Sequence, residues 1–202
     1  MTCNTEGKHR DRVGNLFVVS GPSGAGKGTL LGRALSQVSG AWNSISCTSR
    51  KPREGEVDGV SYHFLTDEQF KQLIDEGGLL EWARVHDHYY GTPRKPALEH
   101  IAQGDQVILE IDVQGAMQVR ESYPSAHLVF IAPPSMDELR RRLVNRGTET
   151  AAEVEVRLSN AELEMARRDE YDYVIVNDDI ETATAELVDF IEGKACGERK
   201  EA

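Results

Sequence analysis

Residues 20–29 have the composition and spacing of a loop that binds phosphate groups. The segment reads Ser-Gly-Pro-Ser-Gly-Ala-Gly-Lys-Gly-Thr and directly follows the apolar run 16–19. Its glycines let the backbone turn tightly and bring N–H groups up to phosphate oxygens. Lys27 adds a positive charge, and the helix predicted by the apolar stripe after the loop adds its positive N-terminal end. The sequence therefore predicts a site for a nucleoside triphosphate.

The loop departs from the common Gly-x-x-x-x-Gly-Lys-[Ser/Thr] pattern at one position. Position 28 is Gly, and the hydroxyl follows one residue later at Thr29. Most such loops use that hydroxyl on Mg²⁺, so Thr29 is the candidate metal contact, directly or through water, unless it bonds phosphate instead. The predicted ATP contacts in the loop are Gly21, Pro22, Ser23, Gly24, Ala25, Gly26, Lys27, Gly28 and Thr29.

The composition limits the class of protein. The chain has 202 residues with 34 acidic and 23 basic side chains, a net charge of −11. This charge argues against a general affinity for nucleic acid or for anionic membranes. No stretch approaches the roughly 20 apolar residues of a membrane helix, and the three cysteines show no Cys-x-x-Cys pair. We expect a cytoplasmic protein with free thiols.

Short apolar strands alternate with helical patterns, which predicts an α/β fold with a parallel sheet. The expected core strands are 16–20, 107–112, 128–132 and 173–177, each nearly continuous in apolar residues. Capping-box spacing at Ser135, Thr66 and Thr150 marks three helix starts.

Two segments differ in composition from this core. Residues 44–102 are rich in Tyr and polar side chains and predict an inserted antiparallel module that binds a substrate. Residues 136–168 predict two helices with a basic stretch, carrying Arg140, Arg141, Arg142, Arg146 and Arg157. The predicted core is then 13–43, 103–135 and 169–192, with flexible tails at 1–12 and 193–202.

Residues 48–65 carry a long ordered pattern. They read Thr-Ser-Arg-Lys-Pro-Arg-Glu-Gly-Glu-Val-Asp-Gly-Val-Ser-Tyr-His-Phe-Leu. This segment closely resembles the signature of guanylate kinases. The resemblance continues through Glu-Trp-Ala at 81–83, Tyr-Tyr-Gly-Thr at 89–92, Leu-Glu-Ile-Asp-Val-Gln-Gly at 109–115 and Val-Asn-Asp-Asp at 176–179. It covers about residues 16 to 192.

The resemblance implies a three-layer P-loop NTPase core, a mobile GMP-binding module at 44–102 and a mobile lid at 136–168. It implies transfer of the γ-phosphoryl group of ATP to GMP, and also to dGMP, with Mg²⁺. The implied catalytic residues are Lys27, Arg50, Arg142, Arg146 and Arg157, and Asn177 is implied to bind ATP. The implied GMP contacts are Ser46, Arg50, Arg53, Tyr62, Glu81, Tyr90, Thr92 and Asp112.

The chemistry of these side chains agrees with the resemblance. The forked guanidinium groups of Arg50 and Arg53 suit a phosphate. Guanine presents N1–H and N2–H donors that adenine lacks, and the carboxylate of Glu81 is suited to accept from both. Asp112 could order Mg²⁺ waters or position an arginine, and both readings stay open.

Two alternatives remain at this stage. The Gly-Lys-Gly-Thr ending also occurs in adenylate kinases, so another nucleoside monophosphate kinase is one alternative. The other is a guanylate-kinase-like module that binds protein partners without catalysis, although such modules usually have a degraded phosphate loop. A monomer and a homodimer are equally compatible with the sequence.

Overall fold

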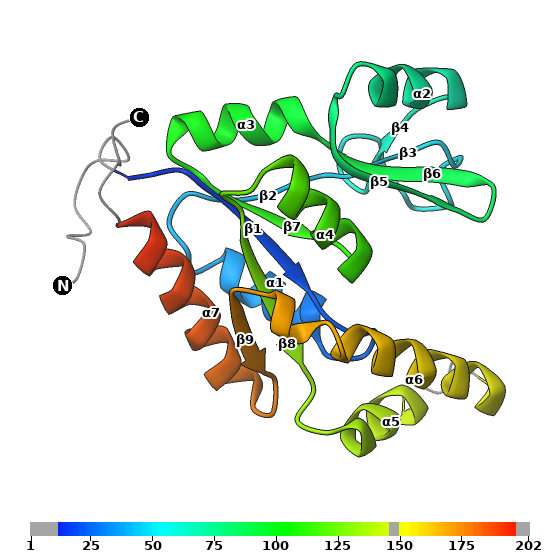
Figure 1. Cartoon of the computed structure of the whole chain (residues 1–202), viewed down its shortest axis with the longest axis vertical. Helices are drawn as coiled ribbons and strands as arrows, with labels where there is room; N and C mark the ends of the chain where they lie inside the picture. The colour runs from blue at the N-terminus through cyan, green and yellow to red at the C-terminus, as the bar shows by residue number, and fades with distance from the viewer. Residues whose placement is uncertain (1–11, 146–149, 197–202) are drawn as a thin grey trace.

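A five-stranded parallel sheet forms the centre of the protein (Figure 1). The computed structural model describes residues 12–145 and 150–196. The strands lie in the order β2 (Ala41–Asn43), β7 (Gln106–Glu110), β1 (Asn15–Ser20), β8 (His127–Ala132) and β9 (Tyr173–Val176). The four predicted core strands are confirmed. The three-residue β2 was missed because it is short and only partly buried.

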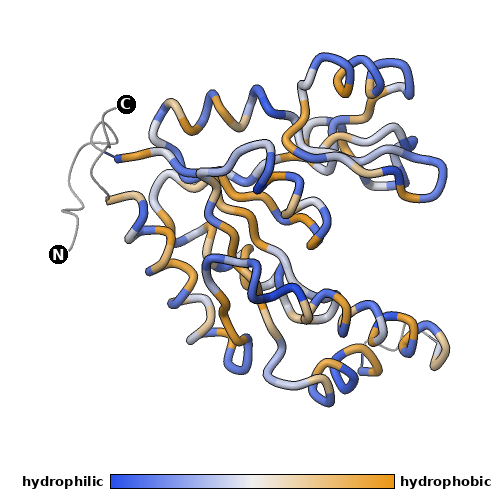
Figure 2. The backbone as a smooth tube through the Cα atoms, in the orientation of Figure 1, coloured by the Kyte–Doolittle hydropathy of each residue, from blue (hydrophilic) through white to orange (hydrophobic). Residues whose placement is uncertain are grey.

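Helices cover both faces of the sheet, which makes three layers. One face packs against α3 (Arg94–Gln103) and α4 (Val113–Ser122), with Val18, Leu109 and Phe130 buried between. The other face packs against α1 (Lys27–Leu35) and α7 (Ile180–Ala195) around Phe17 and Ile131. Alternate residues of β1 therefore enter opposite cores, as expected for a strand buried on both sides. Figure 2 shows the hydrophobic residues concentrated in these central strands.

The inserted module has its own small sheet, in the order β4 (His63–Phe64), β3 (Cys47–Thr48), β6 (His88–Pro93) and β5 (Leu79–Val85). Its pairs with β6 are antiparallel as predicted, whereas β3 and β4 pair parallel. Helix α2 (Asp67–Asp75) begins at the predicted capping box of Thr66. Helix α3 falls within the range predicted for the module, but its Ala97 is buried in the core cluster.

The predicted lid consists of α5 (Met136–Asn145) and α6 (Ala151–Met165), followed by a short 3₁₀ helix at Arg168–Glu170. Leucines 139, 143 and 158 pack the two helices together in a cluster separate from the core. Thr150 caps α6 in the predicted capping box. The module and the lid extend from opposite ends of the core and lie on the same side of it (Figure 1).

Three expectations need correction. Strand β7 ends at Glu110, and Asp112 is the N-cap of α4 rather than the end of the strand, because its side chain accepts a hydrogen bond from the Gly115 N–H. The predicted tails are too long, since α7 continues to Ala195 and Arg12 donates to Glu192 at 2.8 Å.

The third correction concerns the cysteines. Cys47 is a buried free thiol, but Cys196 takes part in a disulfide, so the expectation of free thiols is wrong there. No helix within 12–145 and 150–196 is both long and hydrophobic enough to cross a membrane.

Candidate active site

The phosphate loop connects β1 to α1 and is held open by glycines. Gly24 and Gly26 both have φ of 93°, a left-handed conformation that glycine adopts without strain. A Cβ on Gly26 would also lie only 2.4 Å from the amide nitrogen of Asn177. That amide donates to the carbonyl oxygen of Ala25 at 2.7 Å. Asn177, predicted to bind ATP, therefore also fixes the shape of the loop.

Lys27 is the first residue of α1, and its side chain folds back over the loop. The Lys27 ammonium donates to the carbonyl oxygens of Gly21 and Pro22, the latter at 3.1 Å. This places the positive charge at the loop beside the N-terminal end of the helix. Both features attract the same phosphate groups, so the site has the electrostatics of an anion-binding site.

Two of the three predicted lid arginines reach the loop region. Arg157 of α6 donates to the Ser23 hydroxyl at 2.9 Å. Arg142 of α5 donates to the Asn177 carbonyl oxygen at 2.9 Å and to Glu138 at 2.8 Å. The third, Arg146, lies outside the described residues. The lid in this structure therefore already contacts the loop that it was predicted to cover.

Glu138 holds the lid arginines in place, a role that was not predicted. Its carboxylate accepts hydrogen bonds from Arg141 and Arg142, and these two guanidinium groups lower the pKa of Glu138 to about 2. The spacing of three and four residues on one helix is the signal that identifies such a pair. Ser135 caps the start of this helix as predicted, because its hydroxyl accepts a hydrogen bond from the Glu138 N–H at 3.1 Å.

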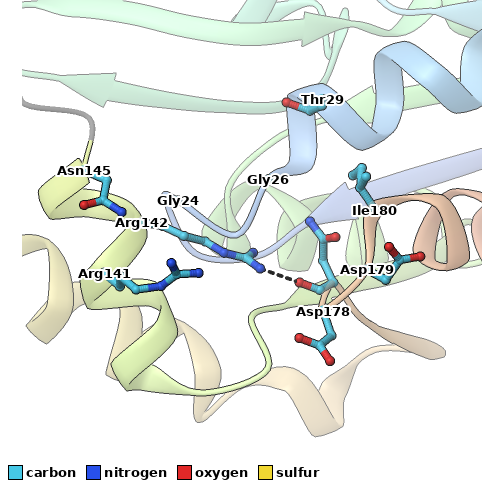
Figure 3. A pocket seen from close by; sticks show the side chains of 10 residues that line it. Gly24, Gly26, Thr29, Arg141, Arg142, Asn145, Asp178, Asp179 and Ile180 are labelled. Atoms are coloured by element: carbon cyan, nitrogen blue, oxygen red, sulfur yellow. Dashed lines mark hydrogen bonds between the residues drawn. The ribbon is translucent and has the colours of Figure 1, made fainter.

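A pocket of about 600 Å³ lies between the phosphate loop, α5 and the start of α7 (Figure 3). This volume lies within the usual range for small-molecule sites. Thr29 and Asn177, both predicted ATP contacts, lie at this pocket. The lining residues are Gly24, Gly26, Thr29, Arg141, Arg142, Asn145, Asn177, Asp178, Asp179 and Ile180.

On the module, Arg50 is held by the carboxylate of Glu56, for which no role was predicted. Its guanidinium group donates to both oxygens of Glu56, at 2.6 and 2.9 Å. Glu56 also accepts from the backbone N–H of Arg53 at 2.7 Å. The guanidinium carbon lies 5.3 Å from the centre of the Tyr62 ring and 5.8 Å from that of Phe64. These contacts restrict the Arg50 side chain to one position.

Tyr90 completes this group. Its ring lies edge-on to Tyr62 with 6.1 Å between ring centres, and its backbone lies opposite Thr48 in the sheet. Four residues predicted to bind the GMP phosphate are thus on neighbouring strands or the adjoining loop. The Arg53 side chain is exposed, while its backbone is fixed by Glu56.

Glu81, predicted to contact the base, is buried on β5, an edge strand of the small sheet. It accepts a hydrogen bond from the Thr92 hydroxyl at 2.7 Å. Burial raises the pKa of Glu81 to about 7, and the nearby charge of Asp112 adds to the shift. A buried carboxylate is stabilised by hydrogen-bond donors around it, and a ligand with N–H groups can supply such donors to Glu81.

The first turn of α4 packs against the Glu81 carboxylate. A Cβ on Gly115 would lie 3.1 Å from a Glu81 carboxylate oxygen, so only a small residue leaves Glu81 in place. Asp112 caps the same turn. Ser46 lies just before β3, where its carbonyl oxygen accepts from the N–H of His63. The residues predicted to contact the base and the phosphate therefore lie on one module, except Asp112, which lies at the start of α4 in the core.

A phosphate loop on a parallel sheet, a separate acceptor module and a two-helix lid together define a phosphate-loop nucleoside monophosphate kinase. Comparison with known proteins narrows this class. A family model described as guanylate kinase matches residues 13–194. The chain therefore belongs to the guanylate kinase family, whose enzymes are ATP:GMP phosphotransferases.

Individual guanylate kinases match this chain over most of its length. The chain is 46% identical over 185 residues to a guanylate kinase of Caldanaerobacter subterraneus, covering 92% of this chain and 90% of that one. It is 51% identical over 177 residues to one of Cutibacterium acnes, covering 87% and 89%. A crystal structure of guanylate kinase from Anaplasma phagocytophilum matches with a TM-score of 0.70 and 34% identity, over 93% of this chain and 89% of that one.

Proposed function

We propose that this protein transfers the γ-phosphoryl group of ATP to GMP, and also to dGMP, giving ADP and GDP. One observation carries the choice of acceptor: a buried carboxylate, Glu81, lies on the same small sheet as the Arg50–Glu56 pair. Guanine offers two N–H donors to the first, and the monophosphate offers an anion to the second. AMP would satisfy only the second of these.

The remaining residues have roles in positioning and charge stabilisation. Phosphoryl transfer needs the two substrates in line and the charge on the transferred group neutralised. We propose that Lys27 and the loop N–H groups bind the β- and γ-phosphates, and that Arg142 and Arg157 add positive charge from the lid. Arg50, Arg53, Tyr62 and Tyr90 would bind the GMP phosphate, and Ser46 and Thr92 the base. Closure of the lid would exclude water, a competing acceptor.

We further propose that Mg²⁺ accompanies ATP. Mg²⁺ prefers oxygen ligands and is usually held by one or two protein groups plus substrate phosphates. Within 12–145 and 150–196, no three His, Cys, Asp or Glu side chains are grouped so that they could hold a metal ion. Oxygen atoms near the loop include the hydroxyl of Thr29 and the carboxylate of Glu110, the last residue of β7. Bound there, the ion would neutralise phosphate charge.

Cytoplasmic location and a place in purine nucleotide metabolism are further proposals that follow from the family. The same holds for the state of assembly, monomer or homodimer, and for the absence of nucleic-acid and membrane partners.

A panel of acceptors tests the proposed reaction. Release of ADP would be measured with GMP, dGMP, AMP, UMP and dTMP at equal concentrations. We expect turnover with GMP and dGMP and little with the others. Turnover that is highest with AMP or a pyrimidine nucleotide would identify another monophosphate kinase. No turnover with any of the five would favour a binding module.

A further inference from the structure

The outer edge of β5 is bound by two side chains of α4 that have no part in the site described so far. The side-chain amide of Gln118 accepts a hydrogen bond from the Trp82 N–H at 3.0 Å and donates one to the Trp82 carbonyl oxygen, also at 3.0 Å. The Ser122 hydroxyl donates to the Leu80 carbonyl oxygen at 2.6 Å. Since β6 pairs with the other edge of β5, these side chains take the place of a further neighbouring strand.

Gln118 suits this position because its side-chain amide carries the same kinds of donor and acceptor as a peptide group. One side chain therefore pairs with both backbone groups of Trp82, as a residue of a neighbouring strand would. A carboxylate in its place would offer no donor to the Trp82 carbonyl oxygen. The two bonds thus fix the position of the strand at Trp82 relative to α4.

Glu81 lies between the two residues that α4 binds. The backbone groups of Leu80 and Trp82 are directed at the helix, whereas Glu81 lies opposite Thr92 of β6. The Glu81 carboxylate also accepts the hydrogen bond from the Thr92 hydroxyl. The backbone on both sides of Glu81 is therefore attached to the core, although Glu81 itself belongs to the module.

One face of α4 carries all of these contacts. Gly115, Gln118 and Ser122 are spaced by three and four residues, so they lie on the same side of the helix. At Gly115 this face leaves room for Glu81, because a Cβ there would lie 3.1 Å from a carboxylate oxygen. Asp112 is the N-cap of the same helix. The two carboxylates predicted to contact GMP are thus brought together by the attachment of β5 to α4.

We propose that Gln118 is a positioning residue for recognition of the base. By holding the Trp82 backbone against α4, it sets where the Glu81 carboxylate stands relative to Asp112, and a misplaced carboxylate would meet the two guanine donors poorly. Ser122 supports the same strand at Leu80. The inference rests on the proposed binding of guanine by Glu81.

The variant Gln118→Met tests this inference, because methionine keeps the length of the side chain and removes both strong hydrogen-bonding groups. Gln103→Met, at an exposed glutamine of α3, is the matched control. KM for GMP and for ATP, and kcat/KM for GMP and for AMP, would be measured for both full-length variants. The measurements would be repeated with Glu81→Gln added, and thermal melting would show whether each fold persists.

We expect Gln118→Met to raise KM for GMP about fivefold or more, while KM for ATP and kcat/KM for AMP stay within about twofold of the control. With Glu81→Gln added, the same substitution should raise KM for GMP by less than about twofold, because the carboxylate that it positions is gone. Ser122→Ala should have a smaller effect in the same direction, since it removes one bond instead of two.

Three results would overturn the inference alone, provided that Glu81→Gln has its expected effect. They are Gln118→Met behaving like Gln103→Met, equal losses with GMP and AMP, and the same increase in KM for GMP with and without Glu81→Gln. Equal losses would mean that Gln118 only stabilises the module as a whole. If Glu81→Gln itself leaves KM for GMP and the preference over AMP unchanged, the proposed recognition of guanine fails, and the inference fails with it.

Discussion

Arg50 and Glu56 form a two-pronged ion pair in which the same carboxylate also accepts the Arg53 backbone N–H. The pair is only partly exposed, with 10% of the Arg50 side chain and 21% of the Glu56 side chain accessible. Glu56 therefore acts as a positioning residue: it fixes the direction of Arg50 before any phosphate is bound. Preorganised cations bind an anion better than mobile ones, because less side-chain entropy is lost.

Glu56→Gln should therefore raise KM for GMP about tenfold while KM for ATP changes little, since an amide cannot hold both guanidinium nitrogens. Arg50→Ala should have a larger effect in the same direction. Initial rates with each substrate varied in turn measure both constants. Glu54→Gln, an exposed neighbour, is the control. Equal increases in both KM values would contradict the role of Glu56 at the acceptor.

Lys27→Ala should lower kcat by at least ~100-fold without unfolding the protein. Lys27 supplies the positive charge within the loop, and charge stabilisation is a large term in phosphoryl transfer. Circular dichroism and thermal melting would show whether the fold persists. A folded variant that kept most of its kcat would mean that the triphosphate binds elsewhere.

Glu81→Gln should narrow the preference for GMP over AMP. The carboxylate can accept from two guanine donors, whereas an amide can accept well from only one. Sites built on such hydrogen bonds discriminate by ~10⁴-fold or more because their own polar groups would otherwise stay unpaired. The measurement is kcat/KM for both nucleotides. An unchanged ratio would show that other residues recognise guanine.

Binding of GMP should weaken as the pH falls below 7. The pKa of Glu81 in the free protein is raised to about 7, mainly by burial, and only the ionised carboxylate accepts both guanine N–H groups. Protonation thus competes with GMP, and affinity should drop by about fivefold between pH 7 and pH 6. The phosphate of GMP also titrates near pH 6.

Glu81→Gln supplies the reference for that titration, because it keeps the phosphate effect and removes the carboxylate effect. Calorimetric titrations with GMP would be compared between the two proteins at each pH. Parallel curves would mean that Glu81 is already ionised throughout this range or does not touch the base.

Much of this architecture could be predicted because its causes are local. The core strands are continuous apolar runs, and the helix starts at Thr66 and Thr150 carry their own capping residues. The phosphate loop is one uninterrupted segment. By contrast, the pairing of β3 with β4 depends on how the module folds back on itself, which no short pattern specifies.

The unpredicted parts of the site depend on contacts between distant segments. The hydrogen bond from the Ser20 hydroxyl to the Asp112 carbonyl oxygen requires β7 to lie beside β1, a pairing of residues about 90 apart in the chain. Asp112 looked like a strand residue because Ile111 extends the apolar run, yet capping of α4 ends the strand earlier. Arg142 was predicted to lie above the triphosphate, but its hydrogen bond to the Asn177 carbonyl oxygen was not predicted.

Asn177 is bonded through its carbonyl oxygen to Arg142 of the lid and through its side-chain amide to Ala25 of the loop. Asn177 therefore connects the lid to the phosphate loop through two hydrogen bonds. Outward rotation of α5 must break the Arg142 bond or pull on the loop. The bond from Arg157 to the Ser23 hydroxyl joins the lid to the loop in the same way. Each hydrogen bond from a charged donor contributes about 1.5–3 kcal/mol, so both bonds favour the lowered lid even before phosphate is bound.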